Sequence, residues 1–133
     1  MSRSNRRGFT LIELLTAMAL LAILAAIAWG RFNKAHEQAL KATLVTDLRN
    51  TATAQELYYR LYSAYANDVI LLQPQMSPSP ESQIHITYAS SIGWAGWNEI
   101  RGTEERCELY IGSDASSALG IATDSERVYC EKP

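Results

Sequence analysis

Three residues carry the chemistry that this sequence offers. Glu13 is the only carboxylate between Phe9 and Gly30, a stretch that is otherwise almost entirely apolar. A carboxylate inside a membrane costs about 2.5–3.5 kcal/mol when central, and residues of this kind are usually functional. Cys107 and Cys130 are the only cysteines. They are two free thiols in a reducing compartment or one disulfide in an exported protein, so the N-terminus has to be interpreted first.

No motif for an enzyme active site or a metal centre is present in the sequence. It lacks a CxxC pair, an HExxH helix, a GxSxG elbow, a P-loop and a GxGxxG turn. His36 and His85 have no ligand spacing, and Glu108 belongs to an acidic run that predicts a solvated face. Asp114 and Asp124 would hold a cation weakly at most. We therefore expect no catalysis, no cofactor and no metal.

The length and the charge distribution narrow the class of protein. A chain of 133 residues forms one domain, or one small domain with a long appendage, which excludes a two-domain enzyme. The formal net charge of −2 is uneven, because residues 1–8 carry three arginines and no acid. Residues 67–133 carry four Lys/Arg against ten Asp/Glu, a net charge of −6. A region this acidic lacks the general basic surface that binds nucleic acid, although its net charge does not exclude a local basic patch.

The apolar N-terminal segment is long enough to cross a membrane. A helix over residues 9–30 would be about 33 Å long, which covers a hydrocarbon core. The arginines of residues 1–8 favour a cytoplasmic N-terminus, whereas Arg31 and Lys34 on the far side weaken that bias. A secretory signal peptide with cleavage after Ala28, or a plain single-span anchor, would also fit this pattern. Glu13 argues against both, because neither needs a carboxylate among apolar residues.

The string Arg7-Gly8-Phe9-Thr10-Leu11-Ile12-Glu13-Leu14 resembles the leader and cleavage site of type IV pilins and type II secretion pseudopilins. In that family a short basic leader ends in glycine, the next residue is usually phenylalanine, and a glutamate follows four residues later. The resemblance implies that prepilin peptidase cleaves between Gly8 and Phe9 on the cytoplasmic side. It also implies N-methylation of the new Phe9 amine, with the apolar helix retained in the mature protein.

The resemblance also suggests a role for Glu13. After cleavage Phe9 carries a charged amine, and Glu13 lies four residues further on the same helix face. A buried amine and a buried carboxylate strongly favour pairing, because an unpaired buried charge is far costlier. In the family the glutamate of one subunit is thought to neutralise the amine of a neighbour. We therefore expect Glu13 to set the register of assembly.

A single helix is predicted from Phe9 to about Tyr62. The stretch from Arg31 to Tyr62 lacks proline and glycine, and residues 58–65 resemble the tyrosine-rich end of a pilin helix. Gly30 stands where proline is common in the family, which leaves local melting of the helix open. In the second half of the helix, an apolar residue at every fourth position predicts a face that packs in the core: Leu40, Leu44, Leu48 and Ala52.

The remainder of the chain predicts a small β-sheet. Strands are expected at residues 84–89, 93–97, 107–112 and 127–130, with a bulge at Gly96. The proline-rich segment 73–80 predicts a surface connection, and residues 113–125 predict a loop. An antiparallel meander packed on the amphipathic helix gives an α+β fold, which resembles the type IV pilin fold. The expected organisation is a leader (1–8), a membrane or filament-core helix (9–30), its amphipathic continuation (31–62) and a globular head (63–133).

The resemblance implies an exported head, and with it a disulfide between Cys107 and Cys130 that closes the loop 107–130. It further implies a structural subunit of a type IV pilus, held in the inner membrane with a cytoplasmic N-terminus and then assembled into an extracellular filament. Adhesion, twitching motility or DNA uptake would be its function. The alternatives are a type II secretion pseudopilin and a soluble exported binding domain.

The expected partners follow from the same resemblance. They are copies of the chain itself, other pilins, prepilin peptidase, the inner-membrane assembly machinery and, before assembly, the membrane. Nucleic acid stays open as a partner.

Overall fold

The computed structural model describes residues 8–133, so the arginines of the predicted leader lie outside the described residues. The chain divides into an N-terminal unit that ends at His36 and a C-terminal unit from Glu37 to Pro133. One long helix, a short 3-10 helix and four strands follow in this order: α1 (Leu11–Tyr62), η1 (Val69–Leu72), β1 (Ser82–Ala89), β2 (Gly93–Ile100), β3 (Arg106–Gly112) and β4 (Tyr129–Glu131).

The described part of the N-terminal unit consists of residues 8–10 and the first part of α1, and every one of these residues is exposed. By length and composition α1 can span a membrane, since its most apolar window has a mean hydropathy of 2.5 and is not buried within the structure. The large hydrophobic side chains exposed along this part of the chain are Phe9, Leu11, Ile12, Leu14, Leu15, Met18, Leu20, Leu21, Ile23, Leu24, Ile27, Trp29 and Phe32.

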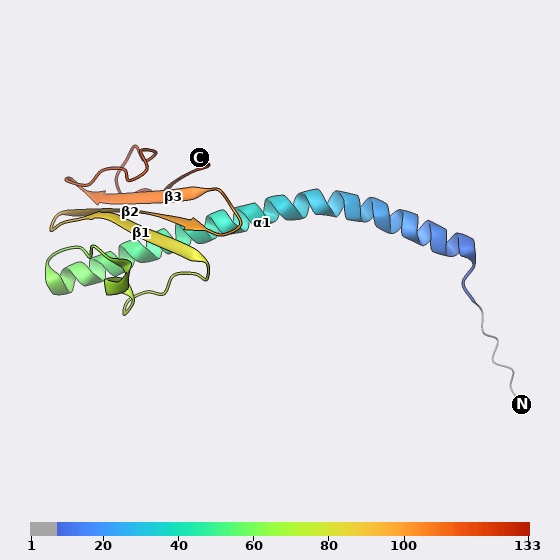
Figure 1. Ribbon diagram of the computed structural model, residues 1–133, viewed down its shortest axis with the longest axis horizontal. Helices are drawn as coiled ribbons and strands as arrows, with labels where there is room; N and C mark the ends of the chain where they lie inside the picture. Colours follow the sequence, from blue (N-terminus) through green and yellow to red (C-terminus); the bar gives the residue numbers. More distant parts are fainter. Residues whose placement is uncertain (1–7) are drawn as a thin grey trace, which may run out of the picture. The chain divides into compact units, whose positions relative to one another are not determined.

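The C-terminal unit is built by packing the second half of α1 against the sheet. Leu44 and Leu48 of α1 are fully buried against Trp94 of β2 and Leu109 of β3, while Leu40 and Ala52 border this core. Figure 1 shows β1, β2 and β3 beside this part of α1. The predicted apolar stripe is therefore confirmed as a core face. The helix also ends at Tyr62, where the sequence predicts its end.

The sheet is an antiparallel meander in the order β1-β2-β3-β4, which confirms the predicted α+β architecture. A bulge does occur where β1 pairs with Gly96, but the extra residue is not in the strand of Gly96. The register shift lies instead in β1, between Ile86 and Tyr88. Gly96 is needed for a different reason, since a Cβ there would lie 2.8 Å from the backbone oxygen of His85. Close approach of two strands, and not an extra residue, explains this glycine.

Buried polar side chains of α1 fix the connection that leads from the helix to the sheet. Gln55 is fully buried, donates to the Ala66 carbonyl at 2.8 Å and accepts from the Ala66 amide at 2.7 Å. Asp47 accepts from the Ser79 hydroxyl at 2.8 Å, which holds the proline-rich segment on the helix. These bonds provide hydrogen-bond partners for loop groups that lie outside the helices and the sheet.

The tyrosines at the end of α1 pack on one another. The rings of Tyr59 and Tyr65 lie 4.9 Å apart between centroids, and the rings of Tyr58 and Tyr62 lie 4.4 Å apart. Burial, together with the hydroxyl's hydrogen bond to Glu56, raises the pKa of Tyr65 to about 12. The aromatic cluster thus packs the end of α1 against the segment that follows the helix.

Candidate functional site

The predicted cleavage site lies just before the helix. Gly8 and Phe9 precede the first helical residue, Leu11, and belong to no regular element. Both are exposed, and a Cβ built on Gly8 meets no atom within 4 Å. The peptide bond between them is therefore accessible in an irregular segment, as a protease requires of the bond that it cuts.

Glu13 begins the helix in a capping box with Thr10. Its carboxylate accepts from the Thr10 amide at 2.8 Å and from the Thr10 hydroxyl at 2.7 Å. In return the Glu13 amide donates to the Thr10 hydroxyl at 3.3 Å. This reciprocal arrangement is typical of a Ser/Thr-x-x-Glu start and is favourable at the positive end of the helix dipole. The spacing Thr10-x-x-Glu13 is the sequence signal that predicts such a capping box.

The predicted disulfide is confirmed. Cys107 and Cys130 are bonded and face each other in the register of β3 and β4. Cys107 is fully buried in the core beneath the sheet. The bond therefore attaches the last strand, which is only three residues long, to the body of the C-terminal unit.

Reduction of this disulfide is expected to destabilise the C-terminal unit by about 3–4 kcal/mol, because the bond removes loop-closure entropy from the unfolded chain. Urea unfolding of the full chain in detergent micelles, with and without reductant, measures the difference. The Cys107→Ser/Cys130→Ser variant should unfold like the reduced chain. An unchanged unfolding midpoint in both cases would contradict this prediction.

Glu108 is buried, which corrects the expectation of a solvated face. It is fully covered by the loop between β3 and β4. Its carboxylate accepts from the Ser117 hydroxyl, from the Leu119 amide at 2.5 Å, from the Ile121 amide at 3.0 Å and from the Ala122 amide. A buried carboxylate with this number of donors is an anchor for the loop, since each donor would otherwise lose its partner.

The charge of Glu108 makes the loop sensitive to acid. Burial raises the pKa of this carboxyl, but the bonds from Ser117, Leu119 and Ala122 outweigh it, so its pKa lies below the ordinary 4.5. A depressed folded-state pKa stabilises the fold above about pH 4.5 and loses that contribution as the pH falls through the lowered value. We expect the protection factor of the Ala122 amide, which compares its exchange rate with that of an unfolded peptide at the same pH, to decrease in the unaltered chain as the pH falls through the lowered pKa of Glu108. A Glu108→Gln variant should show no such pH step, and a step that persists in it would contradict the assignment.

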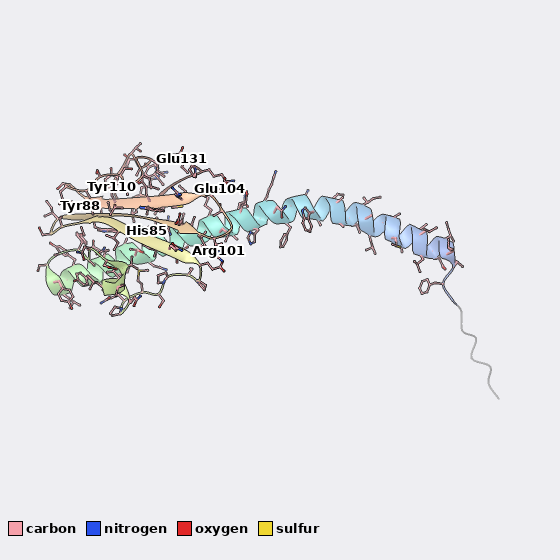
Figure 2. All side chains as sticks on the ribbon, in the orientation of Figure 1. His85, Tyr88, Arg101, Glu104, Tyr110 and Glu131 are labelled. Atoms are coloured by element: carbon pink, nitrogen blue, oxygen red, sulfur yellow. A yellow bond between two sulfur atoms is a disulfide. The ribbon has the colours of Figure 1, made fainter. Side chains whose placement is uncertain are left out.

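A second carboxylate fixes the start of the same loop. Asp114 accepts from the Tyr88 hydroxyl at 2.7 Å and from the Ser90 hydroxyl at 2.5 Å, which lowers the pKa of Asp114 and raises that of Tyr88. A Cβ at Gly93 would lie 2.2 Å from this carboxylate, so the position requires glycine. Figure 2 labels Tyr88 of β1 and Tyr110 of β3, which both pair in register with Ala95 of the strand between them.

The remaining candidates do not form a site. His36 is exposed on α1, and His85 stacks on Trp97 with ring centroids 4.2 Å apart. Asp124 accepts from the Tyr129 hydroxyl at 2.6 Å, away from the bonds of Asp114. Within residues 8–133, no three His, Cys, Asp or Glu side chains come together as metal ligands.

Comparison with known proteins shows which proteins the chain is similar to. The profile of the prokaryotic N-terminal methylation motif matches residues 3–29, which include the predicted cleavage site and Glu13. The chain is also 40% identical, over 73 residues, to the type IV major pilin protein PilA of Myxococcus xanthus strain DK1622. Both findings agree with the resemblance noted in the sequence, and they show that about half of this chain is similar to a type IV pilin. The matched stretch covers 51% of this chain and spans about a third of that relative, 33% of its length.

Proposed function

We propose that the chain is the structural subunit of a type IV pilus. One observation carries the proposal: the part of α1 that lies within the match to the methylation motif exposes large hydrophobic side chains on all sides. A helix that is apolar all round is buried in a membrane or among other helices. The membrane before assembly and the helices of neighbouring copies after it are surroundings that fit this surface.

The proposed route begins with an inner-membrane precursor whose N-terminus is cytoplasmic. Prepilin peptidase cleaves the accessible bond between Gly8 and Phe9, and the new amine of Phe9 is methylated. The chain is thus a substrate and not an enzyme. Assembly machinery of the inner membrane then brings protomers together, and the apolar helices pack side by side with the C-terminal units outside.

Glu13 would control the packing step in this proposal. In the isolated chain its carboxylate is held by Thr10, which leaves it near the first turn of the helix. The charged amine at Phe9 would lie close to the same level of the helix in a neighbouring protomer. A pair of opposite charges is far less costly in an apolar core than either charge alone, so only one axial register between neighbours is favourable.

The structure also bears on release after Ala28, which the signal-peptide alternative requires. Ala28 and Trp29 lie within α1, which begins at Leu11 and continues to Tyr62. A cut there would divide a continuous helix, whereas the bond between Gly8 and Phe9 lies outside it. This difference supports cleavage at the earlier position.

N-terminal sequencing of the mature protein from the producing cell tests the proposal. The expected sequence starts at Phe9 with a methylated amine, and the protein should be found in sheared surface filaments. A mature chain that starts at Trp29 and is soluble outside the membrane would overturn it. Filaments that are lost on gene deletion, without a defect in protein secretion, would separate a pilin from a pseudopilin. Assays of adhesion, twitching and DNA uptake in the same deletion strain would assign the role of the fibre.

A further inference from the structure

The polarity of α1 changes sharply just after Ala28. No basic residue occurs from Phe9 to Ala28, and then Arg31 and Lys34 follow within six positions. Two aromatic residues accompany them, with Trp29 72% exposed and Phe32 69% exposed. Large exposed aromatics and cations on one short stretch of helix are unusual for a surface in water, and no element of the N-terminal unit covers them.

The four side chains are sorted by type around the helix. At about 100° per residue, Trp29 and Phe32 lie on one face, and Arg31 and Lys34 lie on the opposite face. The ring of His36 extends the aromatic face, with its centroid 6.5 Å from that of Phe32. A single depth of α1 thus presents aromatic rings on one side and cations on the other.

The length of the preceding apolar stretch fixes where this level would lie. From Phe9 to Ala28 the helix would rise about 30 Å, which equals the thickness of a typical hydrocarbon core. With Phe9 at one edge of the core, Trp29 falls at the other edge, and Arg31 and Lys34 reach beyond it. That zone contains lipid phosphates beside the first methylene groups of the acyl chains. The cationic face can bind the phosphates there, and the aromatic face can pack on the methylene groups.

We infer that Trp29, Arg31, Phe32 and Lys34 form a collar that binds the phospholipid headgroup layer on the translocated side of the membrane. The aromatic rings lie at the level of the headgroups, and the two cations bind lipid phosphates. This inference rests on the proposed membrane-anchored precursor. It also explains basic residues that otherwise oppose the orientation set by the leader arginines, because here they bind phosphate and stop the helix from sliding inward.

Depth-dependent fluorescence quenching tests the position of Trp29. The full precursor is reconstituted into vesicles of phosphatidylethanolamine and phosphatidylglycerol that carry bromine near the headgroup or near the end of the acyl chain. Because Trp94 and Trp97 also emit, the Trp29 signal is the difference between the unaltered chain and a Trp29→Phe variant. We expect shallow bromine to quench this signal at least twice as strongly as deep bromine.

Three outcomes would contradict the collar. Stronger quenching by deep bromine would place Trp29 in the hydrocarbon core. No quenching in vesicles that still carry the protein would mean that other copies of the chain cover this face instead of lipid. A precursor that fails to float with vesicles at all would overturn the membrane-anchored precursor itself, and the collar with it.

The cationic face is tested by lipid selectivity. Brominated phosphatidylglycerol should quench Trp29 more strongly than brominated phosphatidylcholine, and Arg31→Gln/Lys34→Gln should reduce that preference about fivefold or more. Arg49→Gln/Arg60→Gln is the matched control, because both residues are exposed cations of α1 in the C-terminal unit. The control should keep the preference. A preference that survives in the first variant, or disappears equally in both, would overturn the phosphate contact.

Discussion

Replacement of Glu13 by glutamine is expected to reduce filament formation more than a hundredfold while leaving membrane insertion and cleavage intact. Glutamine also fits the capping box, so the start of α1 and its bond to Thr10 should survive. The negative charge does not survive, and the Phe9 amine of a neighbouring protomer would then be buried without a partner. Breaking one side of a buried ion pair costs about 3–5 kcal/mol for each contact, which a growing fibre repeats at every step.

The comparison of three variants separates the two roles of this side chain. Glu13→Gln removes the charge alone, Glu13→Ala removes the charge and the cap, and Glu37→Gln removes an exposed carboxylate elsewhere on α1. Electron microscopy of sheared filaments and N-terminal sequencing of the membrane fraction provide the measurements. If Glu13→Gln assembles normally and only Glu13→Ala fails, the residue acts as a helix cap and the ion-pair hypothesis is wrong.

Replacement of Glu108 by alanine is expected to lower the free energy of unfolding of the C-terminal unit by about 3–5 kcal/mol. The Ser117 hydroxyl and the amides of Leu119, Ile121 and Ala122 would lose their common acceptor. They recover hydrogen bonds only if the loop opens and admits water, which exposes the side of β3 that it covers. Both routes cost stability, and opening adds mobility to the loop.

Urea unfolding of the full chain in detergent micelles, followed by tryptophan fluorescence, measures this loss. Glu104→Ala is the control, since that carboxylate is exposed on the turn between β2 and β3, and its removal should change stability by no more than about 0.5 kcal/mol. Hydrogen exchange at Leu119 and Ala122 should become faster in the Glu108 variant alone. Equal stability of the two variants would show that the loop does not depend on its buried carboxylate.

Much of this architecture could be predicted from the sequence because its signals are local and periodic. The repeat of Leu44 and Leu48 at every fourth residue marks the buried face of α1, and the strand positions follow from alternating β-forming residues. The cysteine pairing was open until the resemblance implied export, because two cysteines alone do not reveal the compartment. The N-terminal motif stood out because a carboxylate in an apolar run is rare.

What could not be predicted depends on contacts between distant parts of the chain. Glu108 lies in an acidic run, and nothing in that run shows that the loop after β3 folds back over it. Gly96 suggested a bulge, but the reason for it is the approach of His85 from a neighbouring strand. Nothing in the sequence around Gln55 shows that its side-chain amide binds the backbone of Ala66. Tertiary hydrogen bonds leave no periodic trace in a sequence.

The way in which the loop binds Glu108 has a consequence for variation of the surface. Three of the four donors to Glu108 are main-chain amides. These three hydrogen bonds depend on the path of the backbone and not on which side chains the loop carries. An exposed position such as Ser125 could be exchanged, or extended by a short foreign peptide, without releasing the loop from Glu108. Proline at 119, 121 or 122 is the exception, because it has no amide hydrogen to donate. The protein thus has a site for epitope grafting whose attachment is independent of the epitope.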